Sequence, residues 1–300
     1  MFEKIFEEAN KILDIDEDLE LVEIIDSSVV GTPRKEGAFM FVDKNGDSIG
    51  TVGGGMVEYK AILDAKDFLL NKKDGEIKYE LNQKAAKNIG MICGGDNLMK
   101  FTYLTNDEKS RKLLDELKDK NINKNVVFIF GGGHVSLELA KVVKYVGFEY
   151  VVWDDRSDFA NKERFKEAKE VVCDQFSDIL HKVNITEKDF VVIVTRGHAC
   201  DYEIEKQVLK SKACYIGVIG SKNKNQVLYD KLIADGYTKE ELARVCAPIG
   251  LSIAAETPEE IAISIVAELI MYRSMIEKRN KIFSDNKLVE IYKNKLRNLL

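Results

Sequence analysis

The segment VVFIFGGGHVS, residues 126–136, indicates the fold class of the second half of the chain. Its first five residues form an apolar run that is typical of a buried strand, and three glycines follow directly. Gly131 and Gly133 match the pattern G-x-G-x-x-G, with Ser136 in place of the last glycine. A strand, a glycine turn and a helix in this order bring backbone N–H groups against an anion. The segment therefore predicts a phosphate-binding turn.

The same alternation of strands and helices continues to the end of the chain. Further apolar runs are EYVVWD (149–154), EVVC (170–173), DFVVIVT (189–195) and CYIGVIG (214–220). Continuous apolar strands separated by helices indicate a parallel sheet that is buried on both faces. We therefore predict a doubly wound α/β domain over residues 125–300.

The first third of the chain predicts a smaller α+β domain over residues 1–110. The expected strands are LVEIIDSSVV (21–30), EIKYEL (76–81) and NLMKFTYL (97–104), together with a hairpin of GAFMFVD (37–43) and SIGTV (48–52). The expected helix is MVEYKAILDAKDFLL (56–70). Residues 111–124 are rich in charge and poor in apolar side chains, which predicts a helical connector between the domains.

Composition excludes several classes of protein. The 300 residues suit two domains, and a formal net charge of −6 argues against a general nucleic-acid binder. Five cysteines without a C-x-x-C spacing favour free thiols in a reducing cytosol over a disulfide framework or a zinc site. The first residues form an acidic amphipathic helix rather than a signal peptide, and no apolar run approaches the roughly 18 residues of a membrane helix. We expect a cytoplasmic protein without a metal site.

Polar clusters follow the predicted strands. TRGHACD (195–201) comes directly after the fourth strand, and GSKNK (220–224) after the fifth. In a doubly wound sheet, ligands bind outside the carboxyl ends of the strands, where the strand order reverses. We therefore expect Arg196 and Lys222 or Lys224 to line one crevice with the glycine turn and to pair with a phosphate. His198 would either transfer a proton or make a structural hydrogen bond.

An acidic pair, Asp154 and Asp155, ends the second strand a little over twenty residues after the glycine turn. A carboxylate at this place binds a ribose hydroxyl in dinucleotide-binding domains. The pair predicts nucleotide binding, and the alternative is a plain tight turn with solvated aspartates.

The first domain also has glycine-rich turns that carry candidate functional groups. In TVGGGMVE (51–58), three glycines precede a helix whose N-terminus would accept an anion, and Arg34 would join it. In MICGGD (91–96), Cys93 is followed by two glycines that leave space around its sulfur. The alternative for Cys93 is a small buried apolar side chain.

The segment TPEEIAISIVAELIMYRSMIEK begins a long helix. Thr257 is the expected N-cap, Pro258 the first helical residue, and Glu260 the partner in a capping box. This helix would either pack on the sheet or form the interface of a homodimer.

Together these segments resemble the XdhC/CoxI family, the accessory proteins of xanthine dehydrogenase and related molybdenum hydroxylases. The matching strings are GTPRKEGAFMFV, GTVGGGMVE and CGGD in the first domain, then FGGGHVSLELAK, DDRSDFAN, TRGHACDYE, IGVIGSKNK and APIGLSIAAETPEEIAISIVAELI. The resemblance extends from about residue 20 to residue 272.

The resemblance implies a Rossmann-like C-terminal domain and a chaperone-like function. The family is associated with binding molybdenum cofactor (molybdopterin or a dinucleotide form), helping its sulfuration, and delivering it to the apo-enzyme of a molybdenum hydroxylase. Cys93 would then be the sulfur carrier, with a cysteine desulfurase as a second partner, and His198 the second catalytic candidate. The implied cofactor-binding residues are Arg34, Gly53, Gly54, Gly55, Glu58, Gly94, Gly95, Gly131, Gly133, His134, Asp154, Arg196, Asp201, Gly220, Ser221 and Lys222.

Three positions in two segments depart from the family pattern. Met56 stands where many relatives have cysteine, so a mechanism that needs that thiol is in doubt for this chain. Ser252 and Ala254 stand where the family commonly has an acidic residue or glycine and a glycine, which makes the adjacent turn less permissive.

Two other functions compete with cofactor delivery. An NAD(P)-dependent oxidoreductase would use the Gly131–Gly133 turn and Asp154, which favours NAD because a carboxylate repels a 2′-phosphate. A sulfurtransferase would use Cys93. We favour cofactor delivery because glycine turns occur in both domains and the sequence has no evident catalytic dyad or triad.

Overall fold

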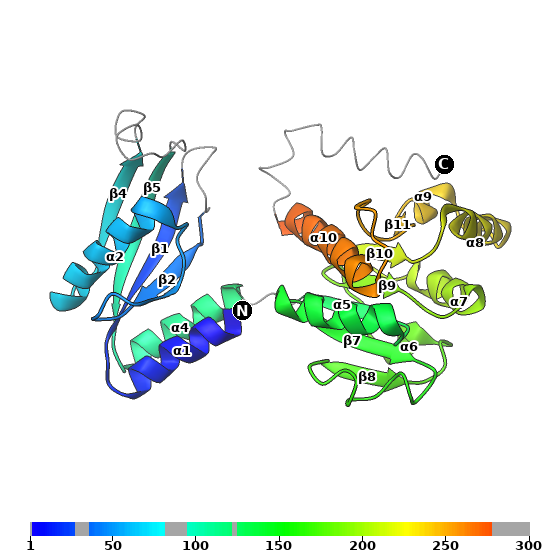
Figure 1. Ribbon diagram of the computed structural model, residues 1–300, viewed down its shortest axis with the longest axis horizontal. Coiled ribbons are helices and arrows are strands. Elements are labelled where there is room, and N and C mark those ends of the chain that lie inside the picture. Colours follow the sequence, from blue (N-terminus) through cyan, green and yellow to red (C-terminus); the bar gives the residue numbers. More distant parts are fainter. Residues whose placement is uncertain (1, 28–35, 82–94, 122–124, 278–300) are drawn as a thin grey trace. The chain divides into compact units, whose positions relative to one another are not determined.

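The computed structural model describes residues 2–27, 36–81, 95–121 and 125–277. The chain divides into two compact units, Met1–Ile122 and Asn123–Leu300 (Figure 1). None of the helices in the described ranges is both long and apolar enough to cross a membrane.

Unit 1 is a five-stranded antiparallel sheet with helices on both faces, and its strand order is β3-β2-β1-β5-β4. Its strands are β1 (Leu19–Ser27), β2 (Phe39–Val42), β3 (Ser48–Gly50), β4 (Gly75–Leu81) and β5 (Gly95–Leu104). Its helices are α1 (Phe2–Asp14), α2 (Gly55–Leu70) and α4 (Glu108–Asn121). These elements confirm the smaller α+β domain expected from the sequence.

Side chains that alternate along the strands build two cores in unit 1. On one face, α2 packs Val57, Ala61 and Ala65 against the sheet. On the other face, α1 and α4 lie together and bury a second cluster that includes Phe6 and Leu114 (Figure 1). Period-two alternation is what allows one antiparallel sheet to serve both cores.

Helix α4 carries most of the charged segment that was expected to be a connector. The division between the units falls after Ile122, and α4 packs against α1 within unit 1. Leu114 and Leu117 lie three residues apart and are both buried, so one side of this charged helix belongs to the core.

Unit 2 contains a six-stranded parallel sheet with the order β11-β10-β9-β6-β7-β8. Its strands are β6 (Val126–Phe130), β7 (Glu149–Asp154), β8 (Glu170–Cys173), β9 (Phe190–Ile193), β10 (Tyr215–Val218) and β11 (Val245–Cys246). Its helices are α5 (His134–Tyr145), α6 (Ile179–Lys182), α7 (His198–Val208), α8 (Lys222–Ala234), α9 (Lys239–Leu242) and α10 (Pro258–Glu277). This order is that of a doubly wound Rossmann fold, which confirms the predicted fold class.

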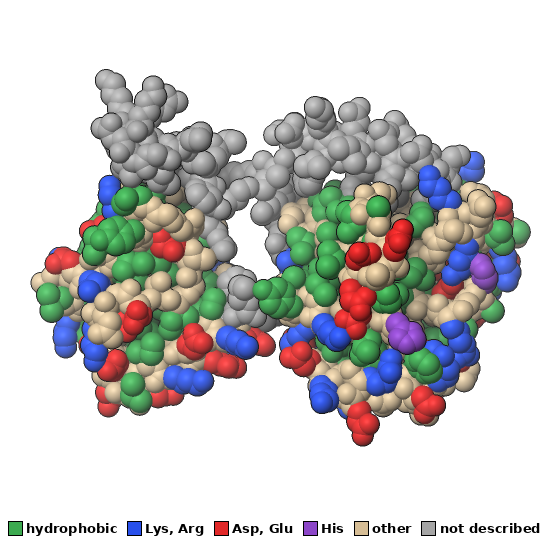
Figure 2. Space-filling view, viewed as in Figure 1, with side chains coloured by type: hydrophobic (Ala, Val, Ile, Leu, Met, Phe, Trp, Pro, Cys, Tyr) green, Lys and Arg blue, Asp and Glu red, His purple; other side chains and the backbone are tan. Residues whose placement is uncertain are grey.

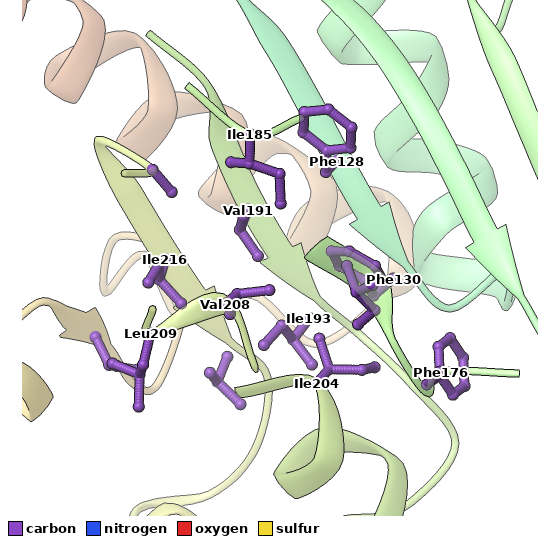
Figure 3. Packing of buried hydrophobic residues seen from close by; sticks show 14 of the residues in the cluster. Phe128, Phe130, Phe176, Ile185, Val191, Ile193, Ile204, Val208, Leu209 and Ile216 are labelled. Carbon is purple, nitrogen blue, oxygen red and sulfur yellow. The ribbon is translucent and has the colours of Figure 1, made fainter. Parts of the chain in front are cut away.

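The apolar strands of unit 2 supply side chains to both faces of the sheet. Phe128 and Phe130 of β6 join a core with α6, α7, α8 and α9, and Figure 3 shows Phe130 near Ile204 and Phe176 in this core. Val127 and Ile129 of the same strand face α5 and α10. Burial on both faces explains why the sequence of β6 is apolar throughout.

Helix α10 begins with the predicted capping box. The Thr257 hydroxyl accepts from the N–H of Glu260, and the Glu260 carboxylate accepts from the N–H groups of Glu256 and Thr257. Ile265 and Leu269 are fully buried in the core shared with α5, so α10 packs on the sheet.

Ala254 precedes α10 and adopts a left-handed backbone conformation with φ of 58°. A side chain in this conformation costs roughly 1–2 kcal/mol, so the backbone at this position favours glycine. We expect Ala254→Gly to stabilise unit 2 by about 0.5–1 kcal/mol, since the relief of strain exceeds the extra chain entropy of glycine. Chemical denaturation of Ala255→Gly, where φ is not positive, is the matched control and should show a loss. A loss at both positions would contradict the assignment of strain to Ala254.

Glu20 in β1 is fully buried, and neither carboxylate oxygen has a hydrogen-bond partner among the described residues. Burial raises the pKa of Glu20 from 4.5 to about 8, and the neighbouring Asp74 adds to the increase. Because the folded-state pKa is the higher one, the contribution of Glu20 to stability is full below pH about 4.5 and is lost as the pH rises through about 8. We expect Glu20→Gln to remove this dependence, on the order of 2 kcal/mol across the window after allowance for relaxation.

Denaturation curves at several pH values would measure this effect in unit 1. The partly exposed Glu23→Gln on the same strand is the control. A parent and an E20Q variant whose stabilities run parallel between pH 4.5 and pH 8 would contradict the prediction.

Candidate functional site

The candidate site lies at the carboxyl edge of the unit 2 sheet, where the strand order reverses between β6 and β9. The segments that follow these two strands lie against each other. The N–H of Val194 donates to the carbonyl of Phe130, the last residue of β6, at 2.9 Å, and the Cβ position of Gly131 is 2.5 Å from the carbonyl oxygen of Val194. The glycine turn and the TRGHACD segment therefore lie side by side, as the sequence predicted. Figure 2 shows side chains of both charges on the visible face of unit 2.

The three glycines of the turn differ in how much space the structure leaves for a side chain. Gly131 has φ of 106°, and an added Cβ atom would lie 2.5 Å from the carbonyl oxygen of Val194. A Cβ on Gly132 would lie 2.5 Å from the carbonyl oxygen of Phe159. Gly133 has φ of −72°, and nothing lies within 4 Å of its Cβ position. Packing thus accounts for the first two glycines, whereas the third opens space at the start of α5.

The start of α5 has the features of an anion site. Gly133 is the N-cap and provides no side-chain acceptor for the N–H groups of the first turn. His134 is exposed as the first helical residue. Ser136, which replaces the third glycine of the motif, is fully buried, and its hydroxyl donates to the carbonyl of Gly131 at 2.5 Å. The serine therefore fixes the turn from inside.

Asp154 is 2 % exposed and is fully engaged by the protein. Its carboxylate accepts from the N–H of Gly132 at 2.8 Å, from the N–H of Arg156 at 3.0 Å, and from the Arg156 guanidinium at 2.8 and 2.9 Å. Burial alone would raise the pKa of Asp154, but the hydrogen bonds from Arg156 and Gly132 outweigh it and hold the pKa below its ordinary value. This arrangement leaves no free acceptor for a ribose hydroxyl, the ligand that the sequence suggested.

Arg196, the candidate phosphate ligand, makes a bidentate ion pair with Asp155 at 2.9 and 3.0 Å. The pair joins the loop after β7 to the loop after β9. Because the Arg196 side chain is 48 % exposed, it can also contact a ligand at this edge. The side chain of Arg156 stacks on Phe159, with 3.7 Å from its guanidinium carbon to the ring centre.

Asp201 is fully buried in the first turn of α7, and its side-chain partners come from two other segments. Its carboxylate accepts from the Thr195 hydroxyl at 2.5 Å and from the Lys224 ammonium at 2.6 Å. The ammonium also donates to the carbonyl of Ile219 at 3.2 Å. These contacts hold the loops after β9 and β10 together, which is a positioning role rather than direct contact with a ligand.

The remaining predicted residues of unit 2 lie at the starts of α7 and α8. His198 is exposed as the first residue of α7. Gly220 has φ of 146°, Ser221 caps α8 by accepting from the N–H of Lys224, and Lys222 is exposed as the first helical residue. His198 and Lys222 are therefore available to a ligand at the carboxyl edge.

In unit 1, the glycine turn before α2 already binds a carboxylate of the chain itself. One oxygen of Glu58 accepts from the N–H groups of Val52, Gly53 and Gly54 at 2.9, 3.2 and 3.0 Å, and from the Thr51 hydroxyl. Burial would raise the pKa of Glu58, but these hydrogen bonds outweigh it and lower the pKa. A ligand anion at this turn would have to displace Glu58.

The other candidates of unit 1 are placed only in part. Gly55 is the first residue of α2, and Gly95 begins β5, where it pairs with Leu81. Arg34, Cys93 and Gly94 lie outside the described residues. Met56, at the position where the family resemblance leads to the expectation of a cysteine, is 37 % exposed.

Two residues of unit 2 are absent from the candidates that the sequence predicts. Arg156, two residues after Asp154, binds that carboxylate through its guanidinium. A basic residue directly after the acidic pair was the sequence feature that could have indicated this contact. Glu205 is 5 % exposed on the buried side of α7, four residues after Asp201. Its signal was that spacing, which puts both acids on the same side as Ile204 and Val208.

Comparisons with known proteins agree with this fold. Over 271 residues the chain is 28% identical to the uncharacterized protein YqeB of Escherichia coli (strain K12), covering 90% of the chain and 46% of YqeB. It is 29% identical over 150 residues to a probable xanthine dehydrogenase subunit of Bacillus subtilis (strain 168), covering 50% of the chain and 43% of that protein. The chain thus spans about half the length of the curated relatives it matches.

A crystal structure of a xanthine dehydrogenase from Bacillus halodurans has the same fold, with a TM-score of 0.75 at 25% identity. The match covers 94% of this chain and 98% of that one. The family model of the XdhC Rossmann domain matches residues 127–269, and the model of the XdhC and CoxI family matches residues 21–80. One model matches most of unit 2 and the other matches half of unit 1, so the chain belongs to the XdhC and CoxI family.

Proposed function

We propose that the chain is an accessory protein of a xanthine dehydrogenase-type molybdenum hydroxylase. It binds molybdenum cofactor, assists its sulfuration and delivers it to the apo-enzyme. The names of the relatives from the two Bacillus species support the connection with xanthine dehydrogenase. The observation that carries the proposal is the open start of α5 at Gly133, at the reversal point of the sheet.

The residues at this edge fit a phosphate-bearing cofactor. The first turn of α5 offers backbone N–H groups without a capping side chain, and its dipole favours a negative charge. His134, His198 and Lys222 are exposed at the starts of three helices and would hold the phosphate and the polar edges of the ligand. When bound, the cofactor supplies the molybdenum centre, and these residues bind and orient it.

Sulfuration needs a sulfur carrier, and we assign that role to Cys93, with a cysteine desulfurase as the donor. Cys200 of α7 is a poor alternative. Burial raises the pKa of its thiol, and Asp155 adds to the increase while Arg196 opposes it. A thiol with a raised pKa is a weak nucleophile at neutral pH.

The engagement of Asp154 disfavours the alternative of an NAD(P)-dependent oxidoreductase. That function needs a free carboxylate for the ribose, and Asp154 has four donors from the protein. Calorimetric titration with NAD and NADP tests the alternative. Tight binding of NAD or NADP together with hydride transfer to a carbonyl compound would favour the oxidoreductase over cofactor delivery.

Co-purification tests the proposed function. The protein is isolated from a molybdenum-replete host, and released pterin is measured by its fluorescence after oxidation. We expect bound pterin in the parent protein and increased activity of a co-expressed molybdenum hydroxylase. Absence of pterin, with unchanged hydroxylase activity and cofactor sulfuration after deletion of the protein, would refute the proposal.

A further inference from the structure

An ion pair between Asp155 and Arg196 spans the end of β6, next to the glycine turn of unit 2. Asp155 directly follows β7, Arg196 comes after β9, and β6 lies between these two strands in the sheet. Gly131 touches both flanking segments, because its N–H donates to the carbonyl of Trp153 at 2.7 Å and its Cβ position is 2.5 Å from the carbonyl oxygen of Val194. A side-chain pair that joins the segments after β7 and β9 must therefore pass beside the turn.

The charged side chains of these two segments neutralise one another. The guanidinium of Arg156 binds the carboxylate of Asp154, and that of Arg196 binds the carboxylate of Asp155. These four side chains together present no net charge to an anion at the start of α5. A ligand anion therefore meets a guanidinium, that of Arg196, whose charge is already matched by a carboxylate of the chain itself.

The pair can open without leaving Asp155 isolated. The Arg196 side chain is 48 % exposed, and exposed ion pairs are weak because water and salt screen them. The Nε atom of Arg156 lies 3.8 Å from Oδ1 of Asp155, so a second guanidinium stays beside the carboxylate when Arg196 moves away. Exchange of Asp155 for another anion on Arg196 is thus inexpensive.

The geometry of the pair matches the binding of a phosphate group. The Nη1 and Nη2 atoms of Arg196 each donate to one carboxylate oxygen of Asp155, at 3.0 and 2.9 Å. The same fork binds two oxygens of a phosphate. A phosphate also has a third oxygen, which can accept from the N–H groups at the start of α5, where nothing lies within 4 Å of the Cβ position of Gly133.

We propose that Asp155 is an internal competitor of the ligand for Arg196. A phosphate group of the ligand takes the place of the Asp155 carboxylate on the guanidinium, and the return of Asp155 promotes release of the ligand. Asp155 therefore lowers the affinity of the site and speeds dissociation, as a protein that hands its ligand on requires. The inference concerns the regulation of the site described under the proposed function, and it rests on that function for the phosphate at the start of α5.

Asp155→Asn is the central variant, because it keeps the size of the side chain and removes its negative charge. Inorganic pyrophosphate is titrated into the whole chain, and binding is measured by calorimetry. We expect D155N to bind pyrophosphate about 5- to 10-fold more tightly than the parent, since the ion pair no longer holds Arg196 away from the ligand. The dissociation rate, measured by rapid dilution, should fall by a similar factor.

Two controls separate competition for Arg196 from a general change of charge. Asp158→Asn removes the same charge from an exposed position of the same loop and should bind pyrophosphate like the parent. Arg196→Gln should weaken binding, and the addition of Asp155→Asn to R196Q should change the affinity by less than about 2-fold, because competition needs both partners. Thermal unfolding of each variant verifies that it is folded.

Three results would overturn the proposal. Weaker binding by D155N than by the parent would show that Asp155 orients Arg196 for the ligand instead of competing with it. An equal gain in D158N, or a gain that persists in the R196Q background, would assign the effect to general electrostatic attraction. Absence of pyrophosphate binding by both the parent and D155N would show that the pair does not exchange with a phosphate.

These results are distinct from failure of the proposed function. If pterin co-purifies with the parent but D155N shows no gain in pyrophosphate affinity, exchange at Arg196 is refuted and cofactor delivery stands. If D155N shows the gain and its dependence on Arg196, but no pterin co-purifies and no hydroxylase is activated, delivery alone is refuted.

Discussion

Replacing Lys224 with methionine is expected to lower the free energy of unfolding of unit 2 by about 3–5 kcal/mol. The Lys224 ammonium lies 2.6 Å from the carboxylate of Asp201, a residue that is fully buried. Methionine keeps much of the length and the apolar contacts of the side chain but leaves the Asp201 charge without its counter-charge. Removal of one partner of a buried pair costs far more than the pair itself contributes. Urea denaturation followed by circular dichroism measures the loss.

Two further variants separate the lost charge from lost packing. Asp201→Asn combined with Lys224→Met removes both charges, and we expect it to recover more than half of the stability lost in K224M. Lys222→Met, at an exposed position at the start of the same helix, should change stability by no more than about 0.5 kcal/mol. A double variant as unstable as K224M would show that the ammonium acts through its hydrogen bond to Ile219 instead.

The sequence predicts the layers of this fold well because they depend on local pattern. The apolar runs of β6, β7, β9 and β10 are buried on both faces, and uninterrupted runs of this length are typical of strands inside a parallel sheet. The rule that ligand-binding loops lie at the reversal of a doubly wound sheet then places the glycine turn beside TRGHACD. The division between the units falls after Ile122, inside the charged segment 111–124, but the charged pattern of α4 gave no indication that Leu114 and Leu117 bury one side of this helix.

The partners of charged side chains could not be predicted in the same way. Asp154 was a candidate for binding ribose because of its position after β7, but whether a carboxylate is free depends on which donors the fold brings to it. The N–H of Gly132 comes from a turn 22 residues earlier, and Arg156 folds back onto the same carboxylate. Glu58 likewise fills the glycine turn that was expected to hold a ligand anion. Glycine turns indicate where an anion can bind, and the fold decides whether the chain supplies that anion.

The open position at Gly133 allows a sharp test of the ligand site, because a side chain there should not disturb the fold. We expect Gly133→Asp to reduce retention of molybdenum cofactor, or of another phosphate-bearing ligand, by at least about 10-fold. The added carboxylate would accept from the N–H groups of the first turn of α5 and would repel a phosphate at the same place. Bound pterin per protein, measured after oxidation, is the readout.

Gly133→Asn is the matched control, because asparagine has the same size and caps a helix about as well without a charge. We expect the thermal stabilities of G133D and G133N to equal or exceed that of the parent, since φ is −72° and nothing lies within 4 Å of the Cβ position. Gly131→Ala should instead be destabilised, since its Cβ atom would lie 2.5 Å from the Val194 carbonyl oxygen at a φ of 106°. The ratio of ligand retained by G133N to that retained by G133D measures the effect of the added negative charge on ligand binding. If both variants retain as much as the parent, the ligand phosphate does not bind at the start of α5, and the position of the cofactor in unit 2 must be sought elsewhere.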